Sequence, residues 1–186
     1  MIDDTDSSSI SSTSDESRQS KLIPFGKTER AEVVLLPDGS EVEISTQSLE
    51  FARSTSALKT GFWNKTVIDV EGKEMCTETA VAKLLRDRGW EAVWVSRGKF
   101  FRGPGISPSC ELSTEAEAEL LKVRGCRNYV GCWDVFAFKS GEVLFVECKA
   151  KGEALTPSQR DWLAAALAAG FTLENFLVVR CRLRAT

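Results

Sequence analysis

Two strongly apolar runs separated by a short polar turn constrain the fold of this chain more than any other feature. The runs span Cys132–Phe138 and Val143–Cys148, and Ser140-Gly141 lies between them. Runs of this length that are rich in β-branched and aromatic residues predict strands. A two-residue loop that contains glycine predicts a hairpin. We therefore expect an antiparallel pair of strands here.

The elements predicted around this hairpin give the order helix, strand, insertion, strand, strand, helix, strand. Each helix has start and stop signals: Thr77 as cap and Gly89 as stop for the first, and Thr156, Pro157 and Gly170 for the last. The predicted segments are a helix over 77–88, a strand over 91–96, a loop over 98–112, a short surface helix over 113–122, a helix over 157–169 and a strand over 176–183. This order predicts an α/β fold.

Composition divides the 186 residues into three parts. Residues 1–20 are mostly serine and acid with a net charge of −4, so they lack the apolar side chains to form a core and are predicted to be a disordered tail. Since the whole chain carries −3, the remainder carries about +1. Residues 21–73 read as a β-rich N-terminal elaboration with a hairpin at Pro37-Asp38-Gly39 and a short strand over 67–70. Residues 74–186 form the main domain, with an insertion at about 98–131.

The absence of histidine excludes several kinds of chemistry. A chain with no histidine has no Ser-His-Asp triad, no Cys-His pair and no mixed Cys/His zinc site. The six cysteines show no C-x-x-C spacing, which favours free thiols over a disulfide framework. No run reaches the length of a membrane span, and no basic-then-apolar leader is present. We expect an intracellular protein, in cytoplasm or nucleus, that is neither secreted nor membrane-bound.

The predicted hairpin brings two carboxylates together. If Ser140 and Gly141 form the loop, Asp134 faces Glu147, with Cβ atoms roughly 5 Å apart. Lys149 lies two residues beyond Glu147 and therefore shares its face. Two neighbouring carboxylates on apolar strands need compensation, and a divalent cation with oxygen ligands would supply it. The alternative is a structural Asp–Lys or Glu–Lys pair at the edge of the sheet.

These residues resemble the motif of a known nuclease family. Asp134 followed by Glu147-Cys148-Lys149 on the next strand resembles the PD-(D/E)XK motif of the restriction-endonuclease-like fold. The glycine before the Asp, at Gly131, and the helix that begins Thr156-Pro157-Ser158-Gln159 are most similar to the VRR-NUC (virus-type replication-repair nuclease) branch. The resemblance covers about residues 74–183. It departs from the motif at Trp133, which stands where the family name has proline.

The resemblance implies a fold and a set of site residues. The fold would be an α-β-β-β-α-β core with a mixed central sheet flanked by helices. Asp134, Glu147 and the backbone carbonyl of Cys148 would hold Mg²⁺ or Mn²⁺, and Lys149 would assist the attacking water. Glu78 would complete the site, although a Glu in the first turn of a helix also favours the helix dipole. Gln159 would face the site, although it could equally be a solvated helix residue.

The expected activity is that of a magnesium-dependent phosphodiesterase, a deoxyribonuclease that acts as an endonuclease. The expected partner is nucleic acid, with DNA preferred to RNA and a homodimer left open. Cations and aromatic residues that flank the site could bind phosphates and stack on bases, although scattered Lys and Arg are typical of any soluble protein; these residues are Arg97, Lys99, Arg102, Arg124, Arg127, Lys151, Phe100, Phe101 and Tyr129. The alternatives are an inactive nucleic-acid-binding or assembly module of the same fold, and an interaction domain with a chance E-x-K.

Overall fold

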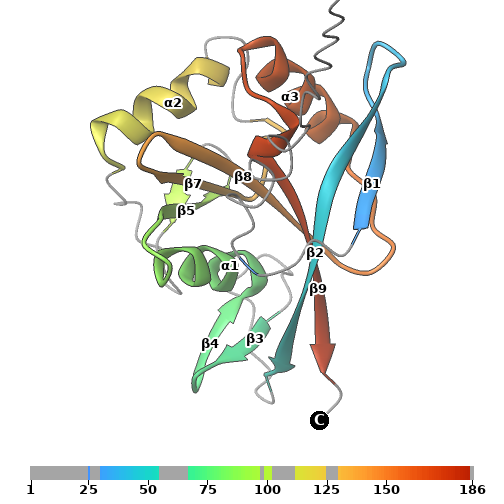
Figure 1. The fold of residues 1–186 in the computed structure, drawn as a ribbon. Helices are drawn as coiled ribbons and strands as arrows, with labels where there is room; N and C mark the ends of the chain where they lie inside the picture. The colour runs from blue at the N-terminus through green and yellow to red at the C-terminus, as the bar shows by residue number, and fades with distance from the viewer. Residues whose placement is uncertain are drawn as a thin grey trace, which may run out of the picture.

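The computed structural model describes residue 25 and residues 30–54, 67–96, 99–101, 112–124 and 130–184. In this part of the chain a nine-stranded mixed sheet is flanked by three α-helices, so the fold is α/β (Figure 1). The predicted tail over 1–20 and, within the insertion over 98–131, residues 98, 102–111 and 125–129 lie outside the described residues. None of the described helices is both long and apolar enough to cross a bilayer.

The sheet has strand order β4-β3-β2-β9-β8-β7-β5-β6, and β1 pairs with β2 beside this path. The strands are β1 (Arg30–Leu35), β2 (Glu41–Arg53), β3 (Val67–Val70), β4 (Lys73–Cys76), β5 (Glu91–Ser96), β6 (Lys99–Phe101), β7 (Val135–Lys139), β8 (Glu142–Lys149) and β9 (Phe176–Arg184). β9 runs parallel to both of its neighbours, β2 and β8, whereas the other pairs are antiparallel. The N-terminal strands are therefore part of the same sheet as the hairpin β7–β8.

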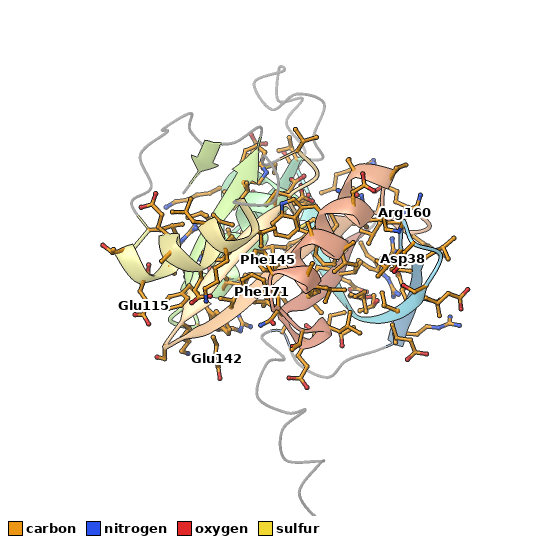
Figure 2. All side chains as sticks on the ribbon, turned by 90° about the horizontal axis from the view of Figure 1, so that it is seen from above. Asp38, Glu115, Glu142, Phe145, Arg160 and Phe171 are labelled. Atoms are coloured by element: carbon orange, nitrogen blue, oxygen red, sulfur yellow. The ribbon has the colours of Figure 1, made fainter. Side chains whose placement is uncertain are left out.

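The sheet separates two hydrophobic clusters. Helices α2 (Thr114–Arg124) and α3 (Pro157–Ala168) cover one face, and α1 (Thr77–Arg86) covers the other (Figure 1). Phe145 on β8 belongs to the cluster on the first face, where its ring packs edge-on against both Trp162 and Phe171. Figure 2 labels Phe145 and Phe171 on this face. The neighbours of Phe145, Leu144 and Val146, belong to the cluster under α1. Alternate residues of β8 therefore serve opposite faces, which explains the continuous apolar run.

The hairpin has the predicted register, from Lys139 opposite Glu142 to Val135 opposite Val146. However, the prediction that its first strand begins at Cys132 is wrong, because β7 begins at Val135 and Asp134 lies in a bend. The backbone N–H of Asp134 donates to the side chain of Glu147 at 3.3 Å, and its carbonyl accepts from Val95 at 2.7 Å. A side chain that hydrogen-bonds to the backbone competes with the hydrogen bonds between strands. The regular pairing of β7 and β8 therefore ends at Val135 and does not reach Asp134.

Three smaller differences concern local structure. Thr77 is not the cap of α1: Cys76 is the N-cap residue and makes no side-chain capping bond, because β4 leads directly into the helix. β4 was not predicted, since its sequence Lys73-Glu74-Met75-Cys76 contains no β-branched residue. The three-residue strand β6 lies within the predicted loop over 98–112. Helix α3 begins at Pro157 with Thr156 as its cap, as predicted.

Candidate functional site

A cavity of about 330 Å³ lies where β8 ends. It receives side chains from both helical layers, since Glu78 belongs to α1 and Gln159 to α3. The lining residues are Thr77, Glu78, Asp134, Glu147, Cys148, Lys149, Ala150, Glu153, Gln159, Cys181 and Leu183. All of the metal-site and catalytic residues predicted from the sequence therefore border one cavity.

Glu147, Lys149 and Gln159 form a closed network inside this cavity. Glu147 is only 1% exposed and Lys149 only 9%. The Lys149 Nζ lies 3.0 Å from Glu147 Oε1 and donates to Gln159 Oε1, also at 3.0 Å. The Gln159 Nε2 donates to Glu147 Oε1 at 2.5 Å. A buried carboxylate and a buried ammonium are thus each paired and hydrogen-bonded, which burial of charge requires.

The start of α3 fixes the orientation of the Gln159 amide. In the capping box, the Thr156 hydroxyl accepts from the Gln159 backbone N–H, and the Thr156 backbone N–H donates to Gln159 Oε1 at 2.9 Å. Because Gln159 Oε1 accepts hydrogen bonds from both the Thr156 N–H and Lys149 Nζ, the amide nitrogen of Gln159 must point toward Glu147. A local helix-start signal therefore also orders the site.

The segment before β7 is packed closely against this helix start. Gly131 has φ of +82°, and a Cβ at this position would lie 2.0 Å from the carbonyl oxygen of Ser158. Trp133 is fully buried, and its indole N–H donates to the Gln159 carbonyl at 3.4 Å. Its ring packs edge-on against Phe176. Trp133 thus packs the Asp134 segment against α3.

Asp134 connects the bend to the end of β8. Its Oδ2 accepts from the backbone N–H of Cys148 at 3.1 Å, and its own N–H approaches Glu147 Oε2. The Cys148 N–H and the Glu147 carboxylate thus contact the same aspartate. The two predicted carboxylates are neighbours in the cavity, although the strand ladder itself ends at Val135.

Glu78 approaches from the opposite helical layer. It lies in the first turn of α1, is 3% exposed, and accepts from the Thr77 hydroxyl at 3.1 Å. Its position agrees with both sequence interpretations, since it borders the cavity and also lies at a helix N-terminus, where a carboxylate is stabilised.

Burial controls the protonation of the groups near the cavity. It raises the pKa of Glu147, and the neighbouring Lys149 opposes this rise. The pKa of Cys148 is also raised, by its interaction with the Cys181 thiol and by burial. Burial raises the pKa of Cys132, and raises that of Cys76 to about 11. These raised pKa values favour the thiol over the thiolate, which is the nucleophilic form of cysteine.

The donor set fits a hard cation by its chemistry. The groups that border the cavity and could bind a metal are the carboxylates of Asp134, Glu147 and Glu78 and the carbonyl of Cys148, and oxygen ligands suit Mg²⁺ and Mn²⁺. Within the described residues, no three His, Cys, Asp or Glu side chains are grouped closely enough to hold a metal ion. Glu147 would have to exchange its bonds to Lys149 and Gln159 for a metal bond.

The predicted nucleic-acid contacts are described only in part. Lys151 is exposed in the turn directly after β8, next to the cavity residue Ala150. Lys99, Phe100 and Phe101 form β6, and Arg124 ends α2, but their side chains are outside the description. Arg97, Arg102, Arg127 and Tyr129 lie outside the described residues altogether.

Several cavity residues were not predicted from the sequence. Glu153 lies in the turn after β8, and its carboxylate accepts from the Ala150 N–H at 2.9 Å. Cys181 and Leu183 come from β9, which pairs with β8 in parallel. Their approach depends on that pairing, for which the sequence gives no local signal.

Comparison with protein-family models, with curated proteins and with solved structures finds no match to this chain.

Proposed function

We propose that this chain is a metal-dependent nuclease that hydrolyses phosphodiester bonds in nucleic acid, with DNA as the expected substrate. The observation that carries the proposal is the convergence of Asp134, Glu147 and Lys149 on one cavity. A buried, hydrogen-bonded acid–lysine pair within a cavity is typical of sites where charge is arranged for chemistry.

The topology supports the restriction-endonuclease-like assignment of the core. With β6 and α2 set aside as parts of the insertion, the helices and strands from α1 onward follow the order α1, β5, β7, β8, α3, β9, which is the expected α-β-β-β-α-β order. β5, β7 and β8 are successive antiparallel neighbours, and β9 lies parallel to β8. The E-x-K triplet stands at the end of β8, as in the PD-(D/E)XK motif.

Under this proposal each residue has a distinct part. Asp134, Glu147 and the Cys148 carbonyl would hold the ion, with Glu78 reaching it from α1. The chemistry that a bound Mg²⁺ supplies is polarisation of the phosphoryl group and a lower pKa for its bound water. Lys149, with its ammonium facing the cavity, would stabilise negative charge on a phosphoryl oxygen or orient the attacking water. Gln159 would hold both Lys149 and Glu147 in place.

One observation favours the second candidate, a non-catalytic nucleic-acid-binding or assembly module of the same fold. The Glu147 carboxylate is already bound by Lys149 and Gln159, so its charge is compensated without an ion. A fold that kept this network for structure alone would show the same contacts.

Cleavage assays separate the two functions. Labelled linear, branched and single-stranded DNA and RNA would be incubated with the protein in Mg²⁺, Mn²⁺ or EDTA. The nuclease proposal expects cleavage with metal and none with EDTA, and expects Asp134→Ala and Glu147→Ala to lose both activity and calorimetric metal binding. Binding of nucleic acid without cleavage under every condition would favour the module. Wild-type activity in either carboxylate variant would contradict the site.

A further inference from the structure

Arg180 lies beside Lys149, yet the proposed reaction assigns it no part. In the parallel pairing of β8 and β9, Lys149 is directly opposite Arg180. Two cations therefore sit next to each other at the end of the sheet. Each has its own carboxylate, because Lys149 pairs with Glu147 and Arg180 pairs with Glu32.

The Arg180 guanidinium is bound on all of its sides. Its Nε donates to Glu32 Oε1 at 2.7 Å, and its Nη2 donates to Glu32 Oε2 at 2.6 Å. Its Nη1 donates to the backbone carbonyls of Ala150, at 2.9 Å, and Glu153. The side chain is only 16% exposed. A bidentate, partly buried pair of this kind is stronger and more directional than an exposed ion pair.

The two carbonyls belong to the turn that follows Lys149. In this turn the Glu153 N–H donates to the Ala150 carbonyl at 3.3 Å, and the Ala150 N–H donates to the Glu153 carboxylate. Gly152 supplies the positive φ of +83°. Ala150 and Glu153 also line the cavity. The guanidinium thus joins β1, β9 and the rim of the cavity at one point.

We propose that Arg180 is a positioning residue for the site: anchored by Glu32, it holds the 150–153 turn and with it the backbone of Lys149. The inference rests on the proposed nuclease function for its effect on the reaction. Its consequence is that β1, which carries Glu32 and lies more than a hundred residues before β8 in sequence, sets the geometry of the E-x-K end of β8. A lysine at position 180 would keep the charge but could not make this fork of bonds.

The hold on the turn is tested without reference to activity. Amide hydrogen exchange of residues 150–154 would be measured in Arg180→Lys and in Arg184→Lys. The second variant is a matched control on the same strand, whose exposed guanidinium pairs with the exposed carboxylate of Glu50. We expect exchange to become at least tenfold faster in Arg180→Lys and to stay unchanged in the control. Equal exchange in the two variants would overturn the proposal.

The effect on the reaction is tested with labelled DNA and Mg²⁺. Arg180→Lys should lower kcat about tenfold or more and leave KM within about twofold, because a positioning residue acts on Lys149 and does not touch the substrate. Glu32→Gln should change kcat in the same direction but less, since both carbonyl contacts remain; it also serves if Arg180→Lys does not fold. A raised KM with normal kcat would show a direct contact with nucleic acid and would overturn the positioning role, as would unchanged kinetics. A wild-type protein without activity would contradict the nuclease proposal, while the exchange comparison would still decide whether Arg180 holds the turn.

Discussion

The two ends of the β7–β8 hairpin differ in how their charged side chains are exposed to solvent. At the turn, Lys139 and Glu142 face each other and are both exposed, and Lys139 donates to the Arg88 carbonyl. At the open end, Glu147 and Lys149 are almost completely buried. The glycines near the two ends differ in the space around them. A Cβ at Gly141 would meet no atom within 4 Å, whereas one at Gly131 would overlap the Ser158 carbonyl.

This difference separates what a hairpin needs from what a site needs. The turn end uses only the local chemistry of a tight turn, with φ of +50° at Ser140 and +83° at Gly141. At the open end two charges lose their hydration, a free-energy cost that an ion pair alone often does not recover. Apolar residues at this end would pack without the cost of burying charge. The need for a stable fold therefore does not by itself explain the buried network.

Gly131→Ala should have the largest effect of the changes considered. It combines a left-handed backbone with a clash against the main chain of α3, and we expect a loss of about 4 kcal/mol in the free energy of unfolding. Gly141→Ala is the matched control: it has nearly the same φ and open space, so it should lose only about 1–2 kcal/mol. Urea unfolding of both variants measures the difference. Equal losses would mean that the open end is not tightly packed.

Lys149→Ala should lower the cleavage rate about a hundredfold, equivalent to about 3 kcal/mol in the transition state. Lys149 faces the carboxylates but is not itself a metal ligand, so nucleic-acid binding should change little. Lys139→Ala, at the exposed end of the same hairpin, should keep the wild-type rate. Single-turnover cleavage of labelled DNA measures both variants. Full activity in Lys149→Ala would remove the functional distinction between the two ends.

Gln159→Glu should make stability depend on pH. It keeps an acceptor for the capping box but turns the donor toward Glu147 into a second carboxylate oxygen. Burial already raises the pKa of Glu147; a carboxyl whose pKa is higher in the folded than in the unfolded state favours folding when protonated, so stability falls as pH rises through that interval. We expect a deficit of about 2 kcal/mol at pH 7 that shrinks toward pH 4–5, near the ordinary pKa of Glu. Thermal unfolding at several pH values tests this, and a deficit that does not vary with pH would contradict it.

Thr156→Ala should have the smallest effect, a loss of about 1 kcal/mol from the missing cap. Thr156→Ser keeps the hydroxyl and should restore most of it. Denaturant unfolding of the pair measures the change. If Thr156→Ala equals the wild type, the capping box does not stabilise α3, and the orientation of Gln159 needs another cause.

Local signals in the sequence predicted the parts of the fold that depend on near neighbours. The turn at Ser140-Gly141 gave the correct register of β7 and β8, and Thr156-Pro157 gave the correct start of α3. Asp134, Glu147 and Lys149 all line one cavity, in agreement with that register, although the pairing itself begins only at Val135. The bend at Asp134 was not predicted, because it depends on side-chain hydrogen bonds that the apolar pattern does not reveal.

The features that were not predicted depend on contacts between distant parts of the chain. β2 lies beside β9 in parallel, and no periodicity within either segment indicates this partner. The bond between Arg180 and Glu32 joins residues 148 positions apart. At α1, Thr77 is of a residue type that is common at helix N-caps, but the strand before it brings Cys76 into the N-cap position. In each case tertiary structure overrides a local preference.

The central place of β9 also has a consequence for how the chain folds. β9 lies between β2 and β8, so the hydrogen-bonded ladder between the N-terminal strands and the β7–β8 hairpin passes through a segment that follows both in sequence. Contacts of such long sequence separation form after much loop-closure entropy has been lost, which slows folding. During synthesis, the edges of β2 and β8 that β9 covers must wait unpaired until it emerges, and unpaired strand edges are the surfaces from which aggregation begins. Refolding should therefore be slow compared with a helical domain of the same size, and most prone to aggregation in its early phase.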